Sequence, residues 1–188
     1  QSAQHSCKTP RRSHKTDSAD VTLSTQWKIR PEEIVVDREL CRGGSAVVLL
    51  GIFRTQMVAV KVMRTAASSK QVQDFKEEFK FAKSMKSKFN VYFYGVCFKP
   101  SLCLVMEYCE RGSLLDVMRD RNMGIEWSHT LKWMFDIVQA ISYLHNWDPP
   151  LVHRDIKAPN ILIDANWGVK LCDFGLTRAT SAGKLEES

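Results

Sequence analysis

The stretch LVHRDIKAPNILI, residues 151–163, constrains the fold of this chain more than any other. Two apolar runs enclose a cluster of polar and charged side chains, namely His153, Arg154, Asp155, Lys157 and Asn160. Apolar runs of this kind are typical of buried segments, whereas charged groups stay in water or pair with one another. The pattern therefore predicts a short polar loop held between two segments of a core.

Two further apolar runs directly after this loop predict a β-hairpin. The runs ILI (161–163) and VKLC (169–172) are joined by a segment rich in Asp, Asn and Gly, which is typical of a tight turn. Because antiparallel pairing brings the ends of a hairpin together, we expect Asn160 beside Asp173, within reach of Asp155. Carboxylate and amide oxygens suit Mg²⁺, which also takes phosphate oxygens. The alternative is a surface turn whose acidic residues share no function. It would make the expected proximity of Asn160, Asp173 and Asp155 a coincidence.

Composition narrows the classes of protein that this chain can belong to. Its 188 residues, 44% of them hydrophobic, suffice for one domain or slightly more. The net charge is +6, but no basic strip alternates with aromatic residues, which favours a solvated basic surface over nucleic-acid binding. No run is long enough for a membrane span, and no signal peptide is recognisable. The six cysteines form no CxxC pair, which indicates reduced thiols in a cytoplasmic protein.

The first half of the chain is predicted to be rich in strands. Residues 1–26 contain almost no large apolar groups, so we expect a disordered leader. From Trp27 on, the runs EIVVDREL, AVVLLGIF, QMVAVKVM, VYFYGVCF and SLCLVMEY predict short strands. Between the third and fourth runs, residues 70–88 show a helical period. Its apolar face carries Phe75, Phe79, Ala82 and Met85.

The second half is predicted to be helical. The run GSLLDVMRDR begins a helix capped by Ser113, with Asp116 three residues later, and residues 127–146 form a longer amphipathic helix. The pattern changes from strand-like to helical near residues 107–113. This predicts an α+β fold in two unlike parts, with a small-molecule site between them. The expected boundaries, completed by the resemblance described below, are 27–106, a hinge at 107–112, and 113–188.

Two charged residues of the first half are expected to form a pair. Strand alternation in VAVK places Ala59 and Lys61 on one face, and Glu78 lies on the apolar stripe of its helix. Because an acid on a buried face needs a partner, Lys61 is its predicted counterpart. Each residue also has an alternative interpretation when it is considered alone. Lys61 could be a charged residue of an edge strand, and Glu78 could lie at the border of the apolar face with its carboxylate in solvent.

The motifs VAVK, HRDIKAPN and DFG, in this order and with a glutamate-bearing helix after the first, resemble those of the eukaryotic protein kinases. The resemblance covers about residues 27–178. WKIRPEEIVVDREL and FYGVC look most like the tyrosine-kinase-like group, and Lys157 is typical of its serine/threonine-specific members. The resemblance implies a two-lobed fold: a β-rich N-lobe with one main helix, and a truncated helical C-lobe that ends in the activation segment.

The resemblance also implies a role for each matching residue, together with ATP and Mg²⁺ as cofactors and a protein as substrate. Asp155 would orient the substrate hydroxyl and Lys157 would contact the γ-phosphate. Asn160 and Asp173 would hold Mg²⁺, and Lys61, paired with Glu78, would bind the α- and β-phosphates. The other nucleotide-binding positions would be Leu40, Gly43, Val48, Ala59, the gatekeeper Met106, the backbone of Glu107 and Cys109, and Leu162.

The chain departs from the family pattern in two places. Cys41 and Ala46 replace the first and third glycines of the phosphate-covering loop, and only Gly43 matches; side chains there limit positive φ and close backbone approach. This favours the alternative of a pseudokinase that binds nucleotide or acts as a scaffold. The family's A-P-E motif and later helices are also missing. We therefore expect a fragment of a longer parent chain, inactive alone, with apolar surface left uncovered on the helix of residues 127–146.

Overall fold

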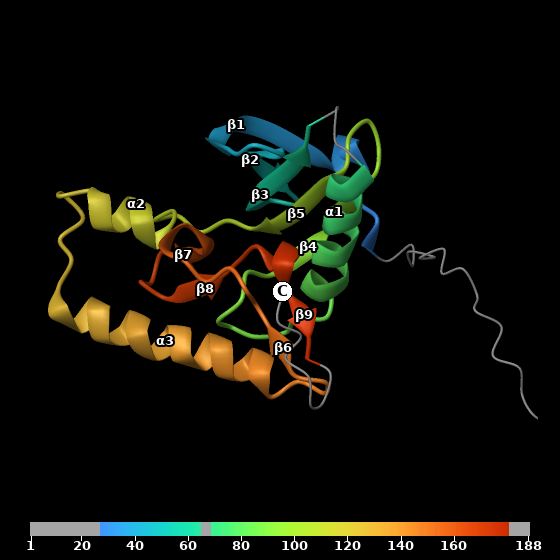
Figure 1. The fold of residues 1–188 in the computed structure, drawn as a ribbon. Helices are drawn as coiled ribbons and strands as arrows, with labels where there is room; N and C mark the ends of the chain where they lie inside the picture. The colour runs from blue at the N-terminus through green and yellow to red at the C-terminus, as the bar shows by residue number, and fades with distance from the viewer. Residues whose placement is uncertain (1–26, 65–68, 181–188) are drawn as a thin grey trace, which may run out of the picture.

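The computed structural model describes residues 27–64 and 69–180 (Figure 1). The predicted leader, 1–26, and the last part of the predicted activation segment, 181–188, lie outside the described residues. The described chain has the predicted α+β architecture: a sheet with one helix is followed by a mainly helical part. The exact boundaries between the predicted domains stay predictions.

The first part is built on a five-stranded antiparallel sheet, in the order β1-β2-β3-β5-β4. All five predicted strands are present. Their bounds are β1 Ile34–Arg42, β2 Ala46–Phe53, β3 Gln56–Met63, β4 Phe93–Cys97 and β5 Cys103–Glu107. A 3-10 turn, Pro31–Glu33, precedes β1. The β-branched runs pack on both faces of the sheet, since Val58 and Val60 belong to one buried cluster and Leu104 belongs to another.

Helix α1 spans Ser69–Ala82 and ends six residues earlier than the sequence predicts. Phe75, Phe79 and Ala82 pack against the sheet as expected, but Met85 lies beyond the helix and packs in the core of the second part. The hydroxyl of Ser84 donates to the carbonyl of Phe81 at 2.8 Å. Such a local side-chain bond competes with the backbone hydrogen bonds of a continuing helix. The helix therefore ends at Ala82, although the helical period of the sequence continues to residue 88.

The second part contains the two predicted helices. Helix α2, Leu114–Arg119, has the predicted cap: the Ser113 hydroxyl accepts from the Asp116 N–H, and the Asp116 carboxylate accepts from the Ser113 N–H. Helix α3 spans Trp127–His145. Within the described residues, no helix is long and apolar enough to cross a membrane.

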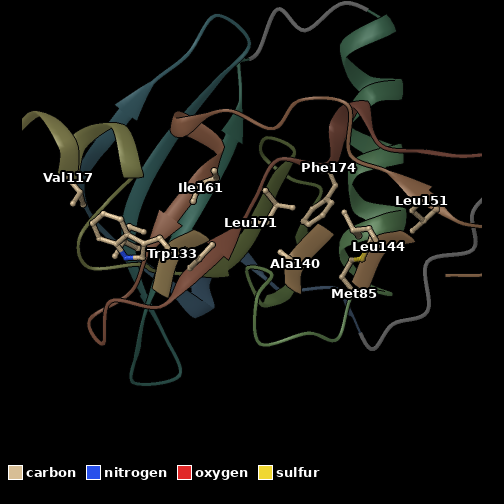
Figure 2. Close-up of a cluster of buried hydrophobic side chains, with 11 residues drawn as sticks. Met85, Val117, Trp133, Ala140, Leu144, Leu151, Ile161, Leu171 and Phe174 are labelled. Carbon is tan, nitrogen blue, oxygen red and sulfur yellow. The ribbon is translucent and has the colours of Figure 1, made fainter. Parts of the chain in front are cut away.

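Two small antiparallel sheets follow α3. Strand β6 (Leu151–Val152) pairs with β9 (Arg178–Ala179), and β7 (Ile161–Ile163) pairs with β8 (Val169–Leu171) in the predicted hairpin. Two 3-10 turns flank the hairpin, at Ala158–Asn160 and Phe174–Leu176. Figure 2 shows the core that the hairpin and α3 share. This core fixes both ends of the polar loop that lies between β6 and β7.

The outward face of α3 is apolar and open to solvent, as the sequence predicts. Its exposed large side chains are Trp127, Leu131, Met134, Phe135 and Val138. A groove of about 400 Å³ between α2 and α3 is lined by Leu114, Met118, Ile125, Thr130, Trp133, Met134 and Ile137. An apolar surface of this size is typical of a face that another segment covers.

Candidate functional site

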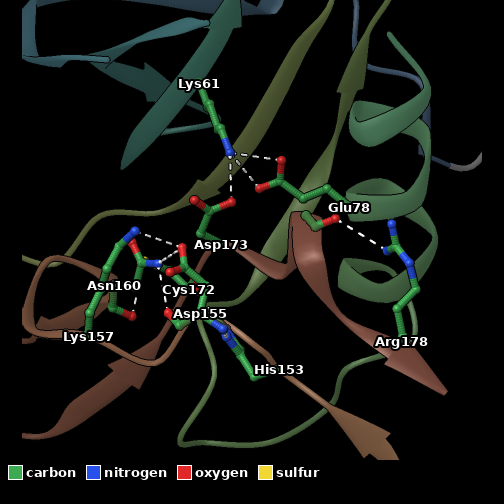
Figure 3. A network of polar contacts seen from close by, with 10 residues as sticks. Lys61, Glu78, His153, Asp155, Lys157, Asn160, Cys172, Asp173 and Arg178 are labelled. Atoms are coloured by element: carbon green, nitrogen blue, oxygen red, sulfur yellow. Dashed lines mark hydrogen bonds and ion pairs between the residues drawn. The ribbon is translucent and has the colours of Figure 1, made fainter. Parts of the chain in front are cut away.

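The predicted pair between β3 and α1 is present, and it has a third member. The Lys61 ammonium lies 2.8 Å from each carboxylate oxygen of Glu78 and 3.2 Å from Oδ1 of Asp173 (Figure 3). Only 18% of the Lys61 side chain and 8% of the Glu78 side chain are exposed. The network therefore joins the sheet, the helix α1 and the segment after β8 at one buried point.

Burial and charge act in opposite directions on this network. Burial lowers the pKa of Lys61, but the carboxylates of Glu78 and Asp173 outweigh it and raise that pKa overall. Burial raises the pKa of Glu78, and the nearby Lys61 charge works against this rise. Lys61 therefore remains an ammonium at neutral pH, with its donors directed at two carboxylates that come from different elements.

The polar loop after β6 holds a second cluster next to the first. The Asn160 amide donates to Oδ2 of Asp155 at 2.8 Å and to its carbonyl at 2.9 Å, and the Lys157 ammonium lies 2.8 Å from Oδ2 of Asp155. Partial burial works to raise the pKa of Asp155, but the bonds from Lys157 and Asn160 lower it overall. Asp155 is thus an ionised acceptor in a fixed position.

A buried histidine orients this loop. His153 is 1% exposed, and its Nδ1 accepts from the Asp155 N–H at 3.3 Å while Nε2 lies 3.0 Å from the carbonyl of Cys172. Because Nδ1 accepts, the tautomer with hydrogen on Nε2 fits both contacts. His153 is the first residue of the HRDIKAPN motif, but no function could be assigned to it from the sequence alone. Its contacts tie Asp155 to the strand end that carries Asp173.

Asp173 itself has an unusual backbone. Its φ of 63° and ψ of 73° lie in the left-handed region, which costs energy for any residue with a side chain, although Asp tolerates it better than most. The Cys172 N–H donates to the carbonyl of Asn160 at 3.0 Å, which confirms that the two ends of the hairpin lie together. The backbone turn directs the Asp173 carboxylate toward Lys61.

The chemistry of this cluster fits a divalent metal with phosphate. The Asn160 amide oxygen and Oδ2 of Asp173 accept no hydrogen bond from the described residues, and both are hard oxygen donors. No group of three His, Cys, Asp or Glu side chains within residues 27–64 and 69–180 could hold a metal alone. Mg²⁺ is usually held by one or two carboxylates together with phosphate oxygens and water, so these two oxygens fit such an ion.

The apolar residues predicted to contact adenine come from several strands, namely β1, β2, β3, β5 and β7. The register sets Val48 opposite Lys61 and Ala59 opposite Met106, and an isolated bridge joins Leu162 to Ser113. Leu40 is half-buried at a bulge of β1. Ala59 and Met106 therefore lie side by side on neighbouring strands of the sheet.

Glu107, the last residue of β5, and Cys109, two residues later, are the predicted backbone contacts of adenine. Cys109 is buried, and burial raises the pKa of its thiol to about 12. Its backbone N–H has no hydrogen-bond partner among the described residues. The Glu107 carboxylate lies 2.8 Å from the Lys170 ammonium of β8 and accepts from the Tyr92 N–H at 2.9 Å. Sequence reasoning missed Lys170, because nothing local marks a pair 63 residues apart.

The connection between β1 and β2, Gly43 to Ser45, is a short turn. The Gly43 N–H donates to the carbonyl of Ala46 at 2.9 Å. Cys41 and Ala46 lie inside paired strands, opposite Val48 and Met63, and neither has a positive φ. The two departures from the glycine pattern are therefore compatible with the strand–turn–strand geometry.

Comparisons with known proteins agree with this geometry. The family described as protein tyrosine and serine/threonine kinase matches residues 34–188. "Stress-activated protein kinase alpha" of Dictyostelium discoideum is 41% identical over 84% of the chain, which covers 25% of that protein. A "Probable serine/threonine-protein kinase" of the same organism is 39% identical over 88% of the chain, which covers 20% of that protein. The chain thus spans a quarter or less of the length of these relatives.

Proposed function

Because the chain belongs to the protein tyrosine and serine/threonine kinase family, we propose that the protein transfers the γ-phosphoryl group of ATP to serine or threonine hydroxyls of a protein substrate. The observation that carries this proposal is the ion-pair network of Lys61, Glu78 and Asp173 beside the cluster of Asp155, Lys157 and Asn160. Phosphoryl transfer depends on positioning and charge stabilisation more than on covalent chemistry, and this site is built from fixed charges.

The buried pair accounts for phosphate binding. Glu78 holds the Lys61 ammonium at 2.8 Å, so that its charge is available to the α- and β-phosphates without reorganisation. Mg²⁺ would be held by Asn160 and Asp173, and it would neutralise charge on the phosphates. Gly43 would cover them from the turn between β1 and β2.

The loop cluster accounts for the transfer itself. Asp155 is ionised and lies beside Lys157, so it can accept a hydrogen bond from the substrate hydroxyl and orient it for attack. Lys157 would then turn toward the γ-phosphate and offset its negative charge. The Asn160 amide, by donating to Asp155, keeps that carboxylate directed into the site.

The adenine ring would lie against the apolar positions at the end of the sheet. Val48 and Ala59 would contact it from the sheet side and Leu162 from the hairpin side, with Leu40 at the edge. Met106 would close the back of the pocket. The Glu107 carbonyl and the Cys109 N–H, which has no hydrogen-bond partner among the described residues, would then hydrogen-bond the ring.

A second candidate function is that of a pseudokinase. It is favoured by the two missing glycines at positions 41 and 46, because a phosphate-covering loop with side chains approaches phosphates less closely. The retained Asp155 and Asp173 argue against it, since a scaffold has no use for a substrate-orienting base or a metal ligand.

Phosphoamino-acid analysis tests the proposed specificity. Full-length protein incubated with labelled Mg·ATP should carry phosphate on serine and threonine, because Lys157 stands two residues after Asp155. The same protein with Asp155→Asn is the control for background labelling. Predominant phosphotyrosine would overturn the serine/threonine assignment.

A further inference from the structure

Two cysteines stand directly opposite each other on neighbouring strands of the five-stranded sheet. Strands β4 and β5 run side by side (Figure 1), and their register pairs Cys97 with Cys103 at the end of the ladder. Opposed residues of an antiparallel pair have Cα atoms about 4.5–5.5 Å apart and side chains on the same face. A disulfide needs Cα atoms about 4.4–6.8 Å apart, so the backbone already meets its main requirement.

Both thiols lie in one apolar cluster, on the face of the sheet that is turned away from α1. Cys97 is 2% exposed and Cys103 is 6% exposed, and both belong to the cluster of Val58, Val60 and Val105. The two cysteines are reduced in the structure. A bulky oxidant such as glutathione disulfide does not fit at this depth, whereas a small hydroperoxide needs only a local opening of the sheet.

The position of the pair makes such an opening accessible. Residues 98–102 connect β4 to β5, and Lys99 and Pro100 within this connection are exposed. An opening at the end of the ladder breaks fewer contacts than one at its centre. Hydrogen bonding with the Cys97 thiol lowers the pKa of Cys103, while the Cys103 thiol and burial raise the pKa of Cys97. Because the thiolate is the reactive form, Cys103 is the better nucleophile of the two.

We propose that Cys97 and Cys103 are a modification site, at which a hydroperoxide forms a reversible disulfide that ties β4 to β5. The Cys103 sulfur attacks one oxygen of hydrogen peroxide, the O–O bond breaks, and the departing hydroxide takes the thiol proton and becomes water. Cys103 is then a sulfenic acid. The Cys97 sulfur attacks the Cys103 sulfur, the S–S bond forms, and the S–O bond breaks as the hydroxyl leaves with the Cys97 proton as a second water. The two thiols together lose two electrons, and one peroxide is reduced to two molecules of water.

Peptide mapping of the full-length protein tests for this disulfide directly. The folded protein is treated with hydrogen peroxide and its remaining thiols are alkylated. Chymotrypsin, which cleaves after aromatic residues, then cuts at Phe98, between the two cysteines. The expected product is a linked pair of peptides that contains Cys97 and Cys103 and separates on addition of dithiothreitol. Cys97→Ser should abolish the linked pair, whereas Cys109→Ser, which removes a buried thiol outside the strands, should retain it.

Thermal unfolding tests whether the bond ties the strands together. A crosslink restricts the unfolded chain, so the oxidised wild type should unfold about 3–6 °C above the same sample after reduction. Dithiothreitol reverses a disulfide but not methionine oxidation, so this comparison isolates the crosslink, and Cys97→Ser should show no such difference. The inference is overturned if the oxidised folded protein contains no Cys97–Cys103 pair, or if Cys103 is linked to another cysteine instead. A pair that forms only in urea, or a linked protein no more stable than the reduced one, overturns it as well.

Discussion

Replacing Lys61 with methionine should destabilise the fold far more than the loss of a surface lysine. Methionine keeps most of the apolar stem but leaves the Glu78 carboxylate, 8% exposed and bonded to Lys61 through both oxygens, without its partner. Removing one member of a buried pair costs about 3–5 kcal/mol. This is a large share of the roughly 5–15 kcal/mol that stabilises a typical domain.

The loss should depend on pH in a defined direction. Burial already raises the pKa of Glu78, and removing the Lys61 charge should raise it further. A carboxyl with a raised folded-state pKa is neutral in both states at low pH, so its penalty is absent below the unfolded pKa of about 4.3. The penalty grows as pH rises through the folded-state pKa, so the deficit of Lys61→Met should be smaller at pH 5 than at pH 8.

Urea-induced unfolding followed by circular dichroism at both pH values measures this deficit. Lys76→Met is the matched control, because Lys76 is an exposed lysine on α1, and it should change the free energy of unfolding by less than about 0.5 kcal/mol. Adding Glu78→Leu to Lys61→Met should recover most of the loss, since the unpaired charge is then gone. A Lys61→Met deficit no larger than that of Lys76→Met, or a double variant no more stable than the single one, would refute the reasoning.

Two further outcomes follow from the site. Asp173→Asn should lower the Mg²⁺-dependent part of ATP affinity while ATP binding without Mg²⁺ changes little, because Asp173 supplies a proposed metal ligand; calorimetry with and without Mg²⁺ checks this, and an equal loss in both conditions would remove Asp173 from the metal site. Burial lowers the pKa of His153, so the stability that its neutral form contributes is present above the unfolded pKa of about 6.5 and is lost as pH falls through the folded-state value. Thermal unfolding of wild type should therefore show a steeper decline below pH 6.5 than that of His153→Asn, and parallel curves would contradict this account.

Several parts of the site could be predicted from local sequence, for identifiable reasons. Glu78 on an apolar stripe demands a cationic partner, and VAVK offers one on a neighbouring strand, so the pair follows from burial alone. The hairpin follows from two short runs around a turn segment, and antiparallel geometry then brings Asn160 next to Asp173. These inferences need only two things: the spacing of apolar residues along a helix or strand, and the free energy that it costs to bury a charge without a partner.

Other features depend on contacts that no local pattern reveals. The end of α1 was predicted too late because Met85 continues the helical period yet packs in a different core. The pair of Glu107 with Lys170 and the contact of Trp27 with Phe93 join segments far apart in the chain. Their partners are set by the tertiary fold, so the sequence marked these residues as apolar or charged without indicating what they touch.

Phosphotransfer by full-length wild type and Asp155→Asn, measured beside the Kd for Mg·ATP of each protein, tests the central claim most directly. Asp155 is proposed to orient the attacking hydroxyl and not to bind the nucleotide, so the account predicts that Asp155→Asn lowers kcat by about 10²–10⁴-fold with ATP affinity nearly unchanged. A wild type that binds Mg·ATP but transfers no more phosphate than Asp155→Asn would contradict the account and establish a pseudokinase.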